Sequence, residues 1–137
     1  IEKPGNLGTM IRTAKSLGIE NIFCSDEITD FYNPNVVRAS IGHMFTLNLL
    51  SDSTENIIKL LKKHNYQIIL MDPDSEKLIN NFQPENNFAL VIGSEQYGIS
   101  KKWHETECTK LKIDSLNDVD SINASTAAAI SMWELLK

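Results

Sequence analysis

The stretch F-A-L-V-I-G-S-E-Q-Y-G at residues 88–98 decides the fold class of this chain. Its first five residues are an uninterrupted apolar run, the pattern of a parallel β-strand buried on both faces. Gly93 follows directly; because glycine has no Cβ, its backbone N–H can approach a ligand closely, and Gly98 permits the loop to turn back. Glu95 between them would repel a phosphate, which excludes a P-loop or a dinucleotide-binding turn. Taken alone, a strand-ending turn with a solvated Glu95 is the commoner explanation.

Apolar runs and helical patterns alternate on both sides of this stretch. Residues 67–71 form a second compact apolar run, and shorter strands are predicted at residues 21–24, 45–50 and 111–113. Helices are predicted at residues 6–17, 34–38, 54–64, 100–107 and 123–136, the first closed by Gly18 as a left-handed cap. In the last helix we expect Ile130, Trp133 and Leu136 to fill the core. The alternation predicts an α/β domain with a mainly parallel sheet flanked by helices, whose ligands bind beyond the carboxyl ends of the strands.

The composition fits one globular domain over residues 1–137. Of these residues 42% are apolar and 23% charged, and no apolar run is long enough to cross a membrane. The net charge of −5 argues against a broad nucleic-acid surface and leaves room only for a local basic patch. Cys24 and Cys108 make no disulfide framework, which indicates a reducing cytosol, and the three histidines have no metal-ligand spacing. Ile1 resembles the end of an apolar strand, so we expect the natural chain to begin earlier.

Three further segments place small or amide residues beside one charged group at a predicted loop–helix junction. They are K-P-G-N-L-G at residues 3–8 running into Arg12, R-A-S-I-G at residues 38–42 and S-I-N-A-S at residues 121–125. Backbone N–H groups at such junctions can hold an anion or a cofactor, and an arginine can grip a phosphate with two parallel hydrogen bonds. Each segment also has an ordinary explanation: Arg12 as a surface residue, Gly42 as a helix cap, and Ser121 or Asn123 as an N-cap.

Taken together, these segments resemble the SpoU family of RNA ribose 2′-O-methyltransferases, within the knotted SPOUT class. N-L-G-T-M-I-R at residues 6–12 is similar to the first family motif, G-S-E-Q-Y-G at residues 93–98 to the second, and S-I-N-A-S-T-A-A-A-I at residues 121–130 to the third. The separations also fit, with twenty residues from Gly93 to Ile113 and nine from Ile113 to Ile122. The resemblance covers nearly the whole chain, and three motifs in order are far more specific than one.

The resemblance implies a fold, an activity and partners. The fold is a parallel sheet whose C-terminal part is threaded into a deep trefoil knot, a rare exception to the usual rule against threading. The activity is transfer of a methyl group from S-adenosylmethionine to a ribose 2′-hydroxyl of tRNA or rRNA. The resemblance also implies a homodimer in which Arg12 of one subunit reaches toward the cofactor of the other. Together with the composition, this predicts a cytoplasmic protein that needs neither a membrane nor a metal.

The resemblance further implies three sets of site residues. The catalytic set is Asn6, Arg12, Glu95, Ser121 and Asn123. The cofactor set, acting largely through backbone groups, is Met71, Ile92, Gly93, Gly98, Ile113, Ile122 and Ser125. The RNA-binding set is Arg12, Arg38 and Ser40.

Methyl transfer gives these residue types distinct tasks. A ribose hydroxyl must lose its proton as it attacks the sulfonium methyl group, and the family mechanism casts Arg12 as the activator of that hydroxyl. A guanidinium is a poor proton acceptor because it stays protonated in proteins. We therefore expect Arg12 to clamp an RNA phosphate and to stabilise developing alkoxide charge. Glu95 would orient Arg12 or Asn6 and is the second candidate for the base.

One departure from the family pattern leaves alternatives open. After Ile113 the family usually continues with Pro-Met and a small residue, whereas D-S-L-N stands here at residues 114–117. That loop should wrap the cofactor, so its change puts tight S-adenosylmethionine binding in question. The alternative is a catalytically impaired member that binds RNA or a partner. Without the resemblance, the pattern would indicate an α/β domain that binds a small ligand.

Overall fold

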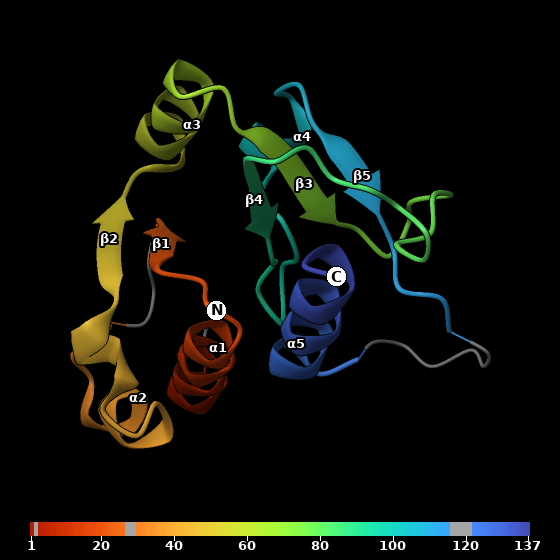
Figure 1. Ribbon diagram of the computed structural model, residues 1–137. Coiled ribbons are helices and arrows are strands. Elements are labelled where there is room, and N and C mark those ends of the chain that lie inside the picture. Colours follow the sequence, from red (N-terminus) through yellow and green to blue (C-terminus); the bar gives the residue numbers. More distant parts are fainter. Residues whose placement is uncertain (2, 27–29, 116–121) are drawn as a thin grey trace.

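The computed structural model describes residues 1, 3–26, 30–115 and 122–137, and it has an α/β architecture (Figure 1). The elements in chain order are α1 (Pro4–Ser16), β1 (Asn21–Ser25), α2 (Pro34–Ala39), the 3₁₀ turn η1 (His43–Thr46), β2 (Asn48–Asp52), α3 (Thr54–Lys63), β3 (Gln67–Met71), β4 (Phe88–Val91), α4 (Lys101–His104), β5 (Thr109–Leu111) and α5 (Ala124–Leu135). Among these helices, none has the length and apolar character needed to cross a bilayer.

The parallel strands form two sheets. β1 pairs with β2, and the second sheet has the order β4-β3-β5; every pair is parallel. Ile69 of β3 lies opposite Leu90 of β4 on one side and Thr109 of β5 on the other. Both faces of β3 are covered, so Ile68, Ile69 and Leu70 are all buried. Ile68 and Leu70 pack against α3 and α4, and Ile69 packs against α5. The predicted α/β class with parallel strands and flanking helices is therefore confirmed, while the division into two sheets was not foreseen.

Helix α1 ends at the glycine that the sequence indicates. Gly18 has a φ of 80°, and its N–H donates to the Lys15 carbonyl at 3.1 Å. The N–H of Ile19 donates to the Ala14 carbonyl at 2.9 Å, which completes a Schellman cap. The helix begins at Pro4, before the expected start, because proline suits the first helical turn, where a backbone N–H has no intrahelical partner.

Helix α1 packs closely against two other helices. Gly8 permits the contact with α2, since a Cβ at this position would lie only 2.4 Å from the Cβ of Ala39. On another face, Ala14 joins Ala128 and Met132 in a buried cluster between α1 and α5, which lie side by side (Figure 1). These contacts bring the first and last helices of the chain together.

The expected core residues of α5 were wrong. Ile130, Trp133 and Leu136 are exposed to 37%, 60% and 44%. The buried stripe instead contains Ala128, Ser131, Met132 and Leu135. These residues recur at helical spacing and face α1 and the sheet, so the bulkier side chains lie on the remaining surface of the helix.

Other element boundaries also differ from the expected ones. The strand predicted at residues 45–50 begins only at Asn48, because residues 43–46 form η1 after Gly42, whose φ is 75°. Residues 109–111 form β5, where residues 111–113 were predicted. Helix α4 ends at His104, short of the expected residue 107. The trefoil knot stays a prediction, since residues 116–121 of its region lie outside the described ranges.

Candidate functional site

Three motifs that are far apart in the sequence meet in one cluster of polar side chains. The Nδ2 of Asn6 donates to Oε1 of Glu95 at 2.6 Å, across 89 positions of sequence. The Nδ2 of Asn123 donates to Oδ1 of Asn6 at 3.3 Å, across 117 positions. We call Asn6, Glu95 and Asn123 the amide–carboxylate cluster. The structure therefore brings together three of the five residues that the sequence proposes as catalytic.

Glu95 stands at the tip of a closed loop that follows β4. Ser94 and Gly98 exchange two backbone hydrogen bonds of 3.0 Å each, and the Tyr97 N–H donates to the Ser94 hydroxyl at 3.1 Å. Gly98 adopts a φ of 68°, and a Cβ on Gly93 would lie 2.5 Å from the carbonyl carbon of Gly98. Both glycines are thus needed for this loop, which holds the Glu95 carboxylate toward α1.

Asn123 combines a structural role with its place in the cluster. Its Oδ1 accepts from the N–H groups of Ser125 and Thr126 at 2.9 and 3.4 Å, as an N-cap of α5. The Ser125 hydroxyl donates to the same oxygen at 2.6 Å. Because the cap uses only the oxygen, the Nδ2 group remains to bind Asn6. Asn123 can therefore cap α5 and belong to the cluster at the same time.

Arg12 is exposed and points away from the amide–carboxylate cluster, although it lies on the same helix, α1, as Asn6. Arg12 comes six positions after Asn6, which places the two side chains about 120° apart around α1 and about 9 Å apart along it. Arg12 borders a surface hollow of about 500 Å³ with Lys15, His43 and the side chains Thr9, Thr13 and Ser16. We call this the cationic hollow. Sequence reasoning missed Lys15 and His43, although a lysine one turn after Arg12 is a readable signal.

The cofactor candidates of the second sheet gather along one edge. Met71 is the last residue of β3, Ile92 follows β4, and Ile113 lies two positions beyond β5. Because neighbouring parallel strands end on the same side, these residues share the carboxyl edge of the sheet with Gly93. The structure thus groups most of the cofactor set in the place where such sheets bind ligands.

The third motif is described only in part. Ile122 is 39% exposed and precedes the cap residue of α5, and Ser125 lies in the first turn of that helix. Ser121 lies outside the described residues, as do Leu116 and Asn117 of the altered loop, so the structure places none of these three.

The RNA-binding candidates differ in accessibility. Arg38 is exposed and donates to Oδ1 of Asn35. Ser40 is fully buried, and its hydroxyl donates to the Val37 carbonyl at 2.9 Å. The expectation that Ser40 contacts RNA is therefore corrected: its side chain closes the end of α2 and does not reach the surface.

Shifted pKa values occur on elements other than those that carry the cluster. A hydrogen bond from Asn56 lowers the pKa of Asp52 at the end of β2. A hydrogen bond from Lys102 lowers the pKa of Glu55, and burial raises the pKa of the Cys108 thiol. Within the described ranges, no group of three or more His, Cys, Asp or Glu side chains could hold a metal ion.

Comparison with known proteins identifies the family to which the chain belongs. The sequence model of the SpoU rRNA Methylase family matches residues 1–133. The chain belongs to this family. The SpoU motifs recognised in the sequence are those whose side chains form the amide–carboxylate cluster.

Curated SpoU relatives align over nearly all of the chain. The 23S rRNA (guanosine(2553)-2'-O)-methyltransferase RlmP of Bacillus subtilis (strain 168) is 26% identical over 135 residues. The 23S rRNA (adenosine(1067)-2'-O)-methyltransferase of Streptomyces azureus is 26% identical over 132 residues. These alignments cover 98% and 95% of this chain but 54% and 49% of the relatives. The chain thus spans about half the length of the curated relatives it matches.

Solved SpoU structures share the fold. AviRb from Streptomyces viridochromogenes, in complex with the cofactor AdoMet, superposes with a TM-score of 0.90 at 25% identity, covering 98% of this chain and 55% of that one. The AdoMet-bound rRNA methyltransferase from Sinorhizobium meliloti gives a TM-score of 0.91 at 27% identity, with coverages of 96% and 51%. The chain therefore has the fold of the SpoU methyltransferases.

Proposed function

We propose that this chain is the catalytic domain of an S-adenosylmethionine-dependent RNA methyltransferase that modifies a ribose 2′-hydroxyl of tRNA or rRNA. The single observation that carries the proposal is the convergence of Asn6, Glu95 and Asn123, one from each family motif. The curated relatives named as 2′-O-methyltransferases support this reading over the catalytically impaired alternative. A structural role alone would not require amide and carboxylate groups from three distant segments.

The carboxyl edge of the β4-β3-β5 sheet fits S-adenosylmethionine. Met71, Ile92 and Ile113 offer partly buried apolar surface there, beside backbone groups exposed at the Gly93 loop. An adenine ring needs this combination, because its faces are apolar and its edge forms hydrogen bonds. Met71, Ile92, Gly93, Gly98, Ile113, Ile122 and Ser125 would hold the cofactor. When bound, it supplies an electrophilic methyl group on sulfur.

The chain's own residues orient the ribose and receive its proton. The Glu95 carboxylate is the group of the cluster able to accept a proton, and the Asn6 amide fixes its orientation through the 2.6 Å hydrogen bond. Asn123 in turn holds Asn6 from the opposite side. The two hydrogen bonds therefore hold the Glu95 carboxylate in place as the proposed base. Ser121 completes the catalytic set that we propose.

Arg12 binds a phosphate of the RNA backbone in this proposal. The cationic hollow joins its guanidinium with Lys15 and His43, which suits a backbone phosphate. Arg38 extends the positive charge along the neighbouring helix α2. A local site of this kind reconciles RNA binding with a net charge of −5, because only a few phosphates need to be contacted.

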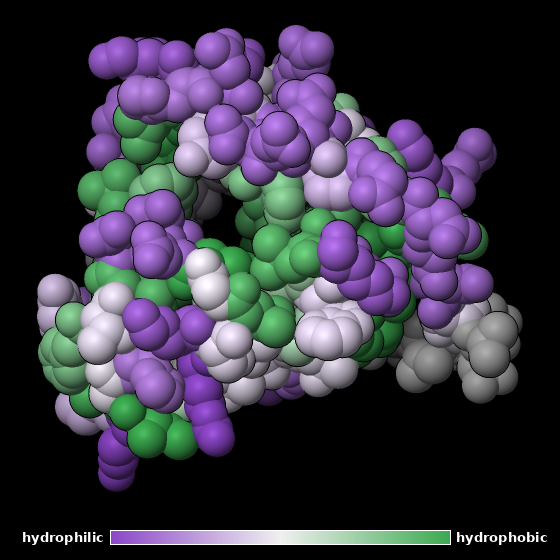
Figure 2. Space-filling view, in the orientation of Figure 1, coloured by the Kyte–Doolittle hydropathy of each residue, from purple (hydrophilic) through white to green (hydrophobic). Residues whose placement is uncertain are grey.

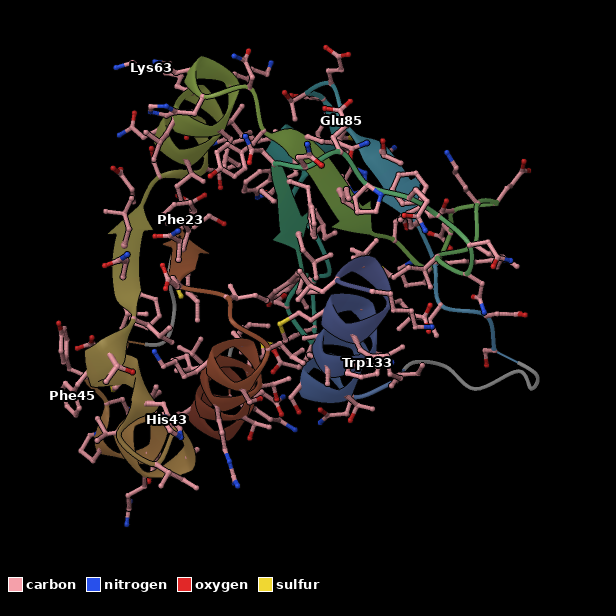
Figure 3. The ribbon with its side chains drawn as sticks, viewed as in Figure 1. Phe23, His43, Phe45, Lys63, Glu85 and Trp133 are labelled. Carbon is pink, nitrogen blue, oxygen red and sulfur yellow. The ribbon has the colours of Figure 1, made fainter. Side chains whose placement is uncertain are left out.

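A homodimer would unite Arg12 with the cluster. Asn6 of the cluster and Arg12 both lie on α1 but on different sides, so a partner subunit can bring its Arg12 to the Glu95 carboxylate. Ile130 and Trp133 expose apolar surface on α5, beside α1, and Trp133 points outward from this helix (Figure 3). We propose that this surface forms the dimer contact. We further propose that residues 1–137 form one SpoU-type domain with a knotted tail, which the family fold supports, and that the protein acts in the cytoplasm.

Calorimetric titration with S-adenosylmethionine tests the cofactor part of the proposal. We expect heat of binding together with a rise in melting temperature at about millimolar ligand. A chain that gave neither signal would be the non-catalytic RNA- or partner-binding member, and the proposal would be rejected. Circular dichroism of the same preparation serves as the control that the protein is folded.

Two conservative variants assign the base. Glu95→Gln keeps the shape of the side chain and loses its proton acceptor, so turnover should fall by about 10²- to 10⁴-fold. Arg12→Lys keeps the charge and loses the two-pronged grip, so RNA affinity should weaken. If Glu95→Gln kept full turnover while Arg12→Lys had none, Glu95 would not be the base.

A further inference from the structure

The helices α1 and α2 and the turn η1 form a unit whose residues carry no acidic side chain. Leu7 of α1, Val36 of α2 and Met44 of η1 pack in one buried cluster, and α1 and α2 lie at the same end of the molecule (Figure 1). Residues 3–19 and 31–50 contain four of the 13 Lys and Arg residues and none of the 18 Asp and Glu residues. The rest of the chain therefore has nine cations against 18 carboxylates, a net charge of −9. Such a division of charge is typical of a surface that contacts a polyanion.

Two large apolar side chains of this unit lie largely outside its core. Ile41 is 60% exposed and Phe45 is 66% exposed. Figure 2 shows hydrophobic side chains on the surface at the end of the molecule where α2 lies. Ile41 has a φ of 54°, a left-handed conformation that is rare for a β-branched residue. A strained turn therefore joins α2 to η1 and leaves both side chains in solvent, which packing of the core does not require.

Phe45 lies close to the cationic hollow. His43 borders that hollow and comes two residues before Phe45 in the 3₁₀ turn η1, where the chain rises about 2 Å per residue. Figure 3 shows Phe45 at the outer edge of this unit, farther from α1 than His43. The phenyl ring therefore stands beside a group of cations. A nucleotide has the matching chemistry, because its negative phosphate is joined to a flat base that stacks on aromatic rings.

We propose that Phe45 stacks on an unpaired base of the RNA while the cationic hollow holds a neighbouring phosphate. This inference rests on the proposed function and adds that the RNA crosses α1, α2 and η1 as a single strand. Arg38, exposed in the last turn of α2, contacts a second phosphate. A base within a duplex has both faces covered by its neighbours, so an exposed ring stacks on a base that is unpaired or splayed out.

Charge favours RNA over a second copy of this chain as the occupant of this surface. In a two-fold contact the same surface meets itself, so Lys15 and Arg38 would approach their own copies. Residues 3–19 and 31–50 contain no carboxylate that could pair with them. Arg38 donates to Oδ1 of Asn35, a neutral partner, so its charge is not neutralised by this contact. The phosphates of RNA supply the negative charge that the unit lacks.

Fluorescence anisotropy with a single-stranded oligouridylate of about ten nucleotides tests the inference. Phe45→Ala should weaken binding by about 5- to 100-fold, because one base loses its stacking partner. Phe45→Trp should keep the affinity, and the fluorescence that this substitution adds should be quenched when the oligonucleotide binds. Phe45→Leu keeps an apolar side chain without a ring, so it should bind as weakly as Phe45→Ala.

Matched controls separate stacking from charge. Tyr32 is 68% exposed, but its N–H donates to Asp30, whose carboxylate repels phosphate, so Tyr32→Ala should leave the affinity unchanged. Arg38→Ala should reduce the slope of log affinity against log salt concentration by about 0.7, and Phe45→Ala should not change this slope. Binding of a duplex of the same length should change less than about twofold in Phe45→Ala, because phosphate contacts dominate it.

Three results would overturn the proposal. They are equal losses of affinity in Phe45→Trp and Phe45→Ala, unquenched fluorescence of bound Phe45→Trp, and no binding by the wild-type protein at about 0.1 mM. Dissociation of a dimer by Phe45→Ala with unchanged RNA affinity would also overturn it and would assign the ring to a contact between copies. The titrations contain no S-adenosylmethionine, so the two proposals fail separately. Binding through Phe45 by a protein that transfers no methyl group would keep this inference and reject the proposed function.

Discussion

Single residues decide how closely the elements of this protein approach one another. Gly5 and Gly8 lie one turn apart on α1, yet their surroundings are opposite. Nothing lies within 4 Å of a Cβ added to Gly5, whereas a Cβ on Gly8 would lie 2.4 Å from the Ala39 Cβ and 2.7 Å from the Val36 carbonyl oxygen. Backbone atoms cannot move aside as a side chain can, so Gly8 is fixed by packing.

The two glycines therefore give opposite results when changed to alanine. Gly8→Ala should lower the free energy of unfolding by about 1–3 kcal/mol, because α1 and α2 must separate. Gly5→Ala should leave it unchanged or raise it by about 0.5–1 kcal/mol, since alanine favours the helix. Urea denaturation of both variants measures the difference. Equal effects would show that the close α1–α2 contact is absent in solution.

The proposed catalytic residues could be predicted from the sequence, and the burial of Ser40 could not. Asn6, Glu95 and Asn123 belong to motifs with characteristic order and spacing, which made their convergence predictable. Ser40 has the same residue type whether it faces solvent or closes a helix, so its burial follows only from the packing of α2. The division of Arg12 from the cluster likewise depends on positions around a helix.

At the scale of elements, the residue that begins α5 contributes both to the stability of the helix and to the candidate site. Asn123 caps α5 through Oδ1 and binds Asn6 through Nδ2. Two substitutions separate these roles, because serine is a good N-cap with no amide to donate to Asn6.

Asn123→Ala should lower both stability and turnover, the former by about 0.5–2 kcal/mol. Asn123→Ser should keep nearly wild-type stability and still lose turnover. Urea denaturation and methyl-transfer rates on the same preparations give the two readouts. Full turnover in the serine variant would remove Asn123 from the site and leave it only as a cap.

The start of α3 predicts a pH dependence. Hydrogen bonds from the side chain of Asn56 and the backbone of Ser53 lower the pKa of Asp52 below that of an ordinary aspartate. A lowered folded pKa means that the stabilisation is present above the unfolded pKa and is lost as the pH falls through the folded one. Asp52→Asn should therefore show a smaller drop in melting temperature between about pH 6 and about pH 2. Identical pH profiles for both proteins would contradict this assignment.

Helical periodicity located α5, but it did not identify its buried face. Ala128, Ser131, Met132 and Leu135 form the buried stripe because this side of α5 faces α1 and the sheet, while Trp133 remains outside. Size is usually a guide to burial, and it misled here because a neighbouring helix decided which residues fit. The boundaries of β2 and β5 depended in the same way on strand partners.

For the whole molecule, the arrangement of α1 predicts active sites shared between subunits. An Arg12→Ala subunit still carries Glu95, and a Glu95→Gln subunit still carries Arg12. In a mixed dimer, one of the two sites then contains both wild-type groups. Homodimers of either variant contain no complete site.

Mixing the two inactive variants in equal amounts, with exchange of subunits, should restore about one quarter of wild-type methyl transfer. The value follows because half of the dimers are mixed and each has one complete site. Adding Trp133→Lys to both chains should abolish the recovery by weakening the proposed contact, whereas Tyr32→Lys, also at an exposed position, should not. No recovery from dimers shown to exchange would place Arg12 and Glu95 in the same subunit.

The sequence predicted the parallel α/β class, because β3 and β4 are compact apolar runs followed by a glycine loop. It did not predict the division into two sheets, since this division depends on which strands are adjacent, and adjacency is a property of the folded chain. The altered residues 114–117 lie in the region where motif reasoning raised its main question about the cofactor.

The central claim is that the cluster of Asn6, Glu95 and Asn123 serves methyl transfer to a ribose. Tritium transfer from labelled S-adenosylmethionine into bulk unmodified RNA, followed by nucleoside mapping, tests it most directly. The account predicts label on 2′-O-methylribose, reduced at least about 100-fold by Asn6→Ala. Absence of label with the wild-type protein, label on the base, or undiminished transfer by Asn6→Ala would contradict it.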